Sequence, residues 1–297
     1  MRRATLLAAL LVCLAGCGGV VSSDEPEPVT PAPVPTEVFQ YPPGVSSDRV
    51  APSTLTETHV RALRTTNYTL TTRQTVRTLD GEPILRSNQT RTVSRNADTY
   101  RGRYDLETNL FVGQQASNIE FWSNRSVVFA RYSTDSPYRD PEVRRWAARN
   151  ETPVTDLTDR NHIEGYLAGT DVSPIRRPPG GGVVLAGNGI RDQDRLIVPL
   201  IVTDPRNLSL RMRVRHDGIV LAARVTYDAT YSDERVRVER AMRVTDIGAS
   251  SVDRPAWIRN SRSDTRDTGE PVREDTVSGA AALRRRQSPS RRRESRL

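Results

Sequence analysis

Apolar and polar residues alternate over long parts of this chain, and this period of two constrains the fold more than any other feature. The alternating stretches are residues 68–76, 84–93, 100–106, 208–214, 219–231 and 236–244. Successive side chains of a strand point to opposite faces, so each stretch predicts a strand with one buried side and one solvated side. Asp80-Gly81 and Asp217-Gly218 are typical hairpin turns between such strands. The chain therefore predicts a mainly antiparallel β fold.

Two segments have the period of a helix instead. Residues 54–57, Thr-Leu-Thr-Glu, fit a capping box that opens a helix. The residues that would then share one helical face are Leu55, His59, Ala62 and Leu63. A second helix is predicted over 157–168, where Ile163, Tyr166 and Leu167 fall on one side. Residues 127–132 are apolar on both faces, which predicts a strand in the centre of the sheet.

The first residues predict export. Met1-Arg2-Arg3 precedes an uncharged apolar run over 4–15, about 12 residues where a membrane span needs roughly 20. A basic start and a short apolar run are typical of a secretory signal, here 1–16. The run ends in Leu-Ala-Gly-Cys at 14–17, which resembles the lipobox of bacterial and archaeal lipoproteins. The resemblance implies a lipid on Cys17 and a location on the outer face of the cytoplasmic membrane.

The two ends of the chain differ in composition from its middle. Residues 17–45 form a lipidated cysteine followed by a proline-rich stalk, since alternating prolines favour extended polyproline geometry. Residues 259–297 hold 11 arginines against 6 acidic residues and have no apolar period, which predicts a disordered basic tail. The tail could add attraction to anionic headgroups. A folded domain is predicted between them, over 46–258.

The cysteine content excludes some ways of stabilising this domain. Cys13 and Cys17 are the two cysteines, and Cys13 would leave with the signal peptide. A lipidated Cys17 leaves no thiol for a disulfide or a thiolate metal site. The domain must then be stabilised by its apolar core, for which about 200 residues are enough.

The order of these segments resembles the LolA/LppX-like lipoproteins. The segments 41–45, 67–69 and 252–257 are more closely similar to an uncharacterised family of haloarchaeal surface lipoproteins, and the resemblance covers roughly residues 1–258. It implies an α+β, mainly antiparallel β fold, a curved half-barrel sheet with helices on its concave face.

This resemblance also implies a function. We expect a binding module for a lipid or another apolar ligand, and the alternative is an envelope protein-interaction or sensing module without a ligand cavity. Such a half-barrel can hold an apolar ligand under its helices. The candidates for lining the cavity are Tyr68, Leu70, Phe129, Tyr132, Met212 and Val214. The alternative at each position is a core residue packed under the helices.

The sequence contains little that points to catalysis. His59, His162 and His216 are widely separated, and no G-x-S-x-G elbow is present. Asp192 and Asp194 bracket Gln193 but lack the glycine and the distal glutamate of a calcium loop, so a solvated turn is favoured. The basic tail has no interleaved aromatics for base stacking. We therefore expect no enzyme, no metal or cofactor and no nucleic-acid partner.

Overall fold

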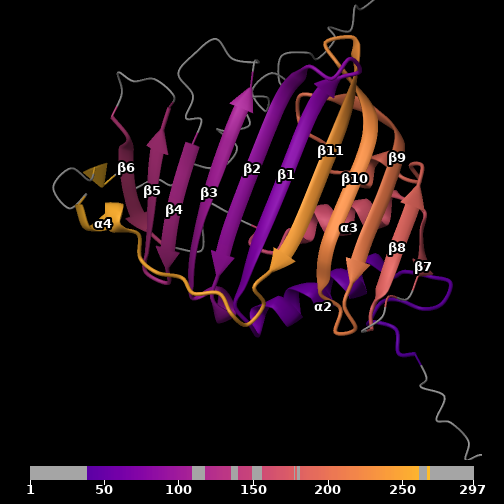
Figure 1. Ribbon diagram of the computed structural model, residues 1–297, viewed down its shortest axis with the longest axis horizontal. Coiled ribbons are helices and arrows are strands. Elements are labelled where there is room, and N and C mark those ends of the chain that lie inside the picture. The colour runs from indigo at the N-terminus through magenta and orange to yellow at the C-terminus, as the bar shows by residue number, and fades with distance from the viewer. Residues whose placement is uncertain are drawn as a thin grey trace, which may run out of the picture. The chain divides into compact units, whose positions relative to one another are not determined.

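The structure is a computed structural model, and it describes residues 39–108, 118–134, 140–148, 156–176, 178, 181–260 and 266–267. The predicted signal peptide, Cys17, the stalk as far as residue 38 and nearly all of the basic tail lie outside these residues. Within the described part of the chain, twelve strands form one sheet in the order β12-β6-β5-β4-β3-β2-β1-β11-β10-β9-β8-β7 (Figure 1). Neighbouring strands are antiparallel except β12 and β6, which confirms the mainly antiparallel β class.

All six alternating stretches of the sequence are strands. The strands are β1 Tyr68–Thr78, β2 Pro83–Val93, β3 Thr99–Thr108, β4 Asn118–Asn124, β5 Val127–Ser133, β6 Glu142–Ala147, β7 Val172–Arg176, β8 Val183–Asn188, β9 Thr203–Val214, β10 Val220–Tyr231, β11 Glu234–Thr245 and β12 Arg266–Asp267. The helices are α2 Pro52–Arg64, α3 Arg160–Gly169 and α4 Ala256–Asn260, with short 3-10 helices η1 Arg95–Ala97 and η2 Gln193–Arg195. The strands β4, β6, β7, β8 and β12 were not predicted, and β12 lies in the segment that was expected to be a disordered tail.

The sheet is made of two meanders joined in its middle. From the middle of the sheet towards one edge, the strands are β1 to β6 in chain order. Towards the other edge they are β11, β10, β9, β8 and β7, in reverse chain order. The pair β1 and β11 joins the two sets, with Leu70 opposite Val244 and Val76 opposite Val238. Because side chains in one register row project from the same face, these pairings place the buried residues of both meanders on a common face.

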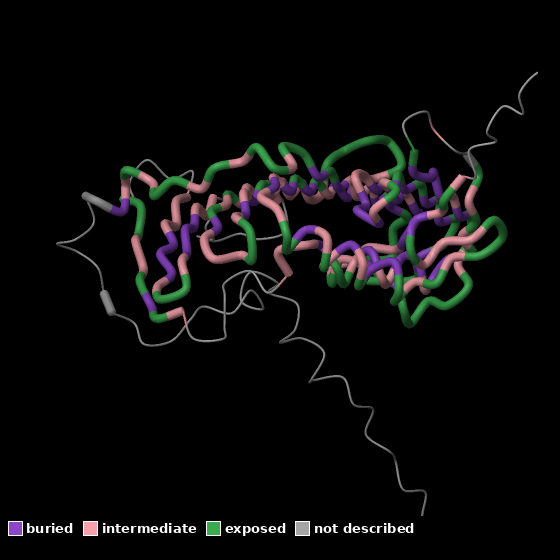
Figure 2. Tube along the Cα trace, turned by 90° about the horizontal axis from the view of Figure 1, so that it is seen from below, coloured by how far each residue is buried: buried purple, intermediate pink, exposed green. Residues whose placement is uncertain are grey.

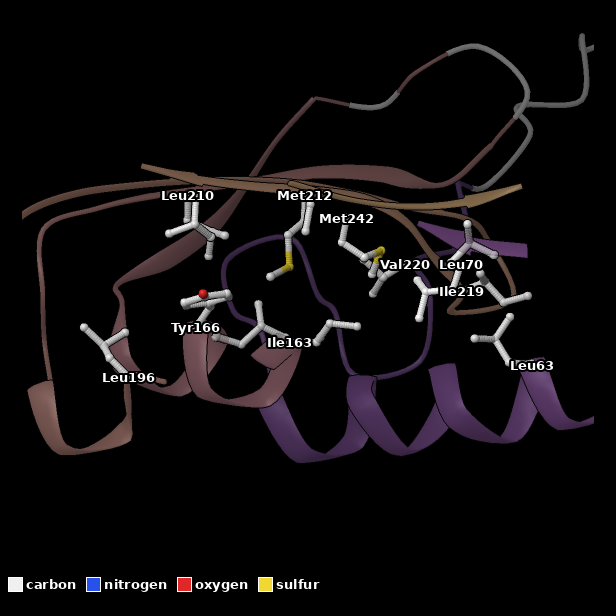
Figure 3. Close-up of a cluster of buried hydrophobic side chains, with 14 of the residues drawn as sticks. Leu63, Leu70, Ile163, Tyr166, Leu196, Leu210, Met212, Ile219, Val220 and Met242 are labelled. Atoms are coloured by element: carbon white, nitrogen blue, oxygen red, sulfur yellow. The ribbon is translucent and has the colours of Figure 1, made fainter. Parts of the chain in front are cut away.

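Helices α2 and α3 lie against this face, here called the helix face, and the opposite face is called the outer face (Figures 1 and 3). Buried residues run along the strands and along the helix surfaces that face them (Figure 2). From α2, the side chains of Leu55, His59 and Leu63 are buried, as the sequence predicts. From α3, Ile163, Tyr166 and Leu167 are buried, again as predicted.

The predicted start of each helix was wrong. α2 begins at Pro52, after Ala51, and no side chain caps it. Proline suits the first turn, where its missing N–H would have had no partner. Thr54 of the expected capping box is therefore inside the helix, where its carbonyl accepts a hydrogen bond from the hydroxyl of Thr58 at 2.8 Å. α3 begins at Arg160, three residues later than expected.

The predicted central position of β5 was also wrong. β5 lies third from one edge of the sheet, next to β6 and β4. Val128, Phe129 and Ala130 in this strand are nevertheless buried, and they point to both faces. On the outer face, Phe129 packs with Trp122 of β4 and Ile258 of α4 in a small second core. A strand can thus be buried on both sides near an edge when another segment covers its outer face.

The other edge of the sheet is β7. This strand contains Pro174, and its pairing with β8 shifts register between Pro174 and Arg176. Pro174 has no N–H to offer a further strand, and Ile175 beside it is 54% exposed.

Candidate functional site

The helix face is filled by side chains where α2 and α3 cover it. Leu63, Leu70, Ile163 and Met242 are among the side chains that fill the space between helices and sheet (Figure 3). Of the predicted cavity residues, Tyr68, Leu70, Met212 and Val214 lie on this face with 0–2% of their surface exposed. Leu70 and Val214 belong to the core, whereas Tyr68 also lines a cavity.

The remaining two predicted cavity residues lie on opposite faces. Tyr132 pairs with Ile119, in a row that continues across Tyr104 to Gln89 on the helix face. Phe129 pairs with Trp122 and packs on the outer face. Residues three apart in a strand always point to opposite sides. Phe129 therefore cannot share a cavity with the other five.

A group of buried and half-buried polar residues lies beside the start of α3, and we call it the polar cluster. It consists of Gln89, Arg91, Asp156, Asp159, His162 and Arg240. The Asp156 carboxylate accepts hydrogen bonds from the backbone N–H groups of Arg160 at 3.0 Å and Asn161 at 2.9 Å. These are N–H groups of the first turn that have no partner within the helix. Asp156 therefore caps α3 from four residues before its first residue.

Asp159 is the most deeply buried carboxylate of this cluster. It adopts a left-handed backbone with φ of 61°, and its side chain is 5% exposed. It accepts a hydrogen bond from the guanidinium of Arg240 on β11 and lies 3.1 Å from Nδ1 of His162. Burial alone would raise the pKa of Asp159, but the charge of Arg240 and the hydrogen bond from His162 outweigh it and hold the pKa at about 2. Asp159 is thus ionised at neutral pH.

Arg91 of β2 lies at the other end of the polar cluster. It is 7% exposed, and its guanidinium donates a hydrogen bond to the carbonyl of Asp156 at 2.7 Å and another to the side chain of Gln89. The hydroxyl of Tyr68 donates to the carbonyl of Leu157 at 3.2 Å, and burial raises the pKa of that hydroxyl. Segment 156–159 is thus attached to β1, β2 and β11 by polar contacts.

His59 attaches the same segment to α2 and β10. Its Nδ1 accepts a hydrogen bond from the backbone N–H of Val220 at 3.1 Å, so the ring proton lies on Nε2, 2.9 Å from the carbonyl of Thr158. The side chain is 0% exposed, and burial lowers the pKa of its imidazole. His59 is a neutral structural histidine.

Two cavities adjoin the polar cluster. One, of about 280 Å³, is lined by members of the polar cluster together with Asn161 and Ile197. The other, of about 360 Å³, extends past Tyr68 and Val93 towards the end of α2. Both are lined by Asp156 and Asn161, so they are neighbours.

A strip of half-buried apolar side chains begins next to this cluster. Tyr104, Ile119 and Tyr132 follow Gln89 in one register row across β3, β4 and β5, and we call these three the aromatic strip. In the next row, Gly102 separates Arg91 from Phe121, and a Cβ at Gly102 would overlap the Phe121 ring. α2 and α3 lie behind the other half of the sheet (Figure 1).

The polar cluster was not predicted, although the sequence carries a signal for part of it. Arg240 occupies an inward position of β11 between Val238 and Met242, and Arg91 occupies one of β2 beside Val93. A charged residue in the apolar register of a strand indicates a buried partner. Asp159 and His162 gave no such signal, because their contact depends on how α3 docks.

The other candidate residues remain apart. His216 is exposed in the turn between β9 and β10. Asp192 accepts a hydrogen bond from the backbone N–H of Asp194 at 3.1 Å in an exposed turn, as expected. In the described ranges, no three His, Cys, Asp or Glu side chains form a group that could hold a metal ion. No helix among the described residues is long and apolar enough to cross a membrane.

No known protein family matches the sequence, and no curated protein matches it.

Proposed function

We propose that this protein is a lipid-anchored extracytoplasmic binding module on the outer face of the cytoplasmic membrane, with Cys17 as the lipidated residue. The lipobox-like ending of the signal and the proline-rich stalk support the anchor. The antiparallel sheet with helices against one face supports a LolA/LppX-like half-barrel in which α2 and α3 lie on the concave side. In this proposal the chain is related to the haloarchaeal surface lipoproteins that it resembles.

The ligand in this proposal is an amphipathic lipid-like molecule. The observation that carries it is the position of the aromatic strip, which starts at the polar cluster and lies on the half of the helix face away from α2 and α3. Its side chains are half-buried: Ile119 and Tyr132 pack against the edge of the core and keep part of their surface exposed. Apolar surface beside a few convergent polar groups is what a site for a small amphipathic ligand requires.

Each end of the ligand has a matching part of the site. The apolar tail would lie along Tyr104, Ile119 and Tyr132 and would remove their exposed apolar surface from water. The polar head would occupy the cavity of about 280 Å³ at the polar cluster. That cavity contains donors from Arg91 and Arg240 and acceptors from the nearby carboxylates, so it suits a head group that both donates and accepts hydrogen bonds.

Native mass spectrometry on protein purified without detergent tests this proposal. We expect a lipid that is bound non-covalently, in addition to the one attached to Cys17. We also expect added lipid to raise the melting temperature of the protein. Ile119→Ser removes apolar contact in the middle of the strip and should weaken lipid binding about five- to tenfold. Val143→Ser, a half-buried position on the outer face of β6, is the matched control and should leave binding unchanged. A protein that holds no non-covalently bound lipid and gains no thermal stability from added lipid would refute the proposal.

An envelope protein-interaction module is the second candidate function. The large apolar side chain of Ile175 on the edge strand β7 favours it, because this side chain is 54% exposed and a partner could bury it. Crosslinking on intact cells should then give one dominant neighbour, and a diffuse set of products would count against this function.

In our proposal the chain acts by binding and not by catalysis. Within the described residues, His59 forms hydrogen bonds with backbone groups and the His162 ring contacts the carboxylate of Asp159, so neither histidine is bonded to a hydroxyl that it could activate. A substrate screen that found hydrolysis abolished by His162→Gln would contradict this part of the proposal.

A further inference from the structure

The outer face carries a groove that the proposed lipid site does not involve. It has a volume of about 740 Å³ and lies across β1, β11, β10, β9 and β8. The residues that line it are Thr71, Arg73, Val184, Arg211, Met212, Arg213, Ala222, Ala223, Arg224, Glu239, Ala241, Met242 and Arg243. We call it the arginine groove, after the five arginines in this set.

The strand register explains how the groove forms. Ala241 lies in one row between Arg73 and Arg224, and Ala222 lies in the next row between Arg243 and Arg213. Each alanine is therefore a low point between two long side chains. Strands are about 4.8 Å apart, so the arginines of each row start roughly 10 Å from one another across the alanine. The result is a small apolar floor between two pairs of cations.

The charge of the groove is not balanced within the described residues. Glu239 is the one carboxylate among its lining residues, and it pairs with Arg224 at 3.0 Å. Arg73, Arg211, Arg213 and Arg243 are exposed and have no ion-pair partner among the described residues. Arg211 also lies directly opposite Arg224 in the register. Like charges at facing positions are unfavourable, and a bound anion would offset this repulsion.

We infer that the arginine groove binds a linear acidic polysaccharide, a sugar chain that carries sulfate or carboxylate groups. Two pairs of cations at a regular separation suit repeated anions on one chain better than a single anion. Guanidinium groups bind carboxylates and sulfates through paired hydrogen bonds. The alanine floor leaves room for a flat, uncharged ring between the cations.

Two other polyanionic partners fit the groove less well. A membrane surface is favoured by exposed large apolar side chains, but none of those in the described structure, Leu79, Ile175, Ile197 and Leu200, lines the groove. A protein partner usually buries aromatic anchors, and the groove contains no aromatic residue. The alanine floor also lies lower than the arginines on either side of it, so a narrow chain can reach it and a flat bilayer cannot.

Binding of dextran sulfate to the full chain tests this inference, with uncharged dextran as the ligand control. The double variant Arg213→Gln and Arg243→Gln should bind dextran sulfate roughly tenfold more weakly than the unaltered protein. The matched variant Arg95→Gln and Arg101→Gln removes the same charge from exposed positions outside the groove and should change binding less than about twofold. The basic tail is present in all three proteins, so its contribution is common to them.

Arginine labelling with phenylglyoxal, read by peptide mass spectrometry, locates the bound chain without any substitution. Dextran sulfate should protect Arg213 and Arg243 and leave Arg101 reactive. Raising the salt to 1 M shortens the screening length to about 3 Å and should abolish this protection. Equal losses in both double variants, or no protection in the groove, would overturn the inference. A different result for the Arg213→Gln and Arg243→Gln variant would also overturn it. If this variant no longer bound vesicles of anionic phospholipid but bound dextran sulfate as the unaltered protein does, the ligand would be a membrane surface.

Discussion

Protonation of His59 should destabilise the fold in mild acid. Both ring nitrogens are used, Nδ1 as acceptor from Val220 and Nε2 as donor to Thr158, and the side chain is fully buried. A proton on Nδ1 would break the bond from Val220 and place a charge in the core. Burial therefore lowers the pKa of His59 below its usual value of 6.5.

The sign and size of the effect follow from proton linkage. Because the folded pKa is the lower one, the unfolded chain binds the proton first as the pH falls. The free energy of unfolding is then constant above about pH 7 and decreases below pH 6.5. One proton gives a limiting slope of about 1.4 kcal/mol per pH unit, so the loss at pH 5 is at most about 2 kcal/mol. The lowered pKa values of Asp159, Asp217 and Asp228 place their titration below this window.

Urea denaturation followed by tryptophan fluorescence at pH 5 to 8 measures this slope. His59→Gln removes the titrating ring and can keep one of the two hydrogen bonds, so it should cost about 1–2 kcal/mol at pH 8. Its stability should not change down to pH 5, and the two curves should converge as the pH falls. Parallel curves for the two proteins over this range would refute the assignment of the slope to His59.

Three further predictions concern stability and anchoring. Arg240→Met leaves the buried carboxylate of Asp159 without its ion-pair partner and should lower the free energy of unfolding by roughly 3–5 kcal/mol. Adding Asp159→Asn removes the unpaired charge and should restore part of this loss, as measured by urea titration of the double variant. Gly102→Ala places a Cβ against the Phe121 ring and should cost about 1–3 kcal/mol, with a smaller cost in a Phe121→Leu background; strictly additive costs would contradict the overlap. Cys17→Ser should move the exported protein from the membrane fraction to the soluble fraction or leave it unprocessed, and a processed Cys17→Ser protein that still sediments with membranes would place the anchor elsewhere.

The strands of this fold were predictable where a single face is buried. β9 alternates strictly between buried and exposed residues from Leu208 to Val214, and β11 does so at Val236–Val238 and again at Met242–Thr245, because one side packs on the helices and the other is solvated. β4 was not predicted, since Phe121, Trp122 and Ser123 are buried in succession and erase the period of two. β5 showed the same lack of alternation and was placed in the centre for that reason. Burial on both faces came instead from α4, whose position a local pattern does not encode.

The site was less predictable than the fold, because it depends on register and docking. Leu70 and Val214 were predicted to face inward because they are apolar residues of alternating strands, and both are buried in the core. The same choice grouped Phe129 with Tyr132, although their odd spacing in one strand separates them. The aromatic strip becomes visible only when the β2, β3, β4 and β5 registers are known. The arginine groove likewise requires the pairing of β1 with β11, which are far apart in the sequence.

The proline in β7 has a consequence for how copies of this protein behave when they are crowded. An open sheet edge invites the edge of another molecule, and continued pairing of this kind leads to aggregation. Pro174 removes one donor from this edge, and the adjacent register shift interrupts the regular row of backbone groups. Tethering to a membrane would hold copies side by side at a high local density. On such a surface, an edge that cannot continue the sheet would keep neighbouring molecules from joining their sheets.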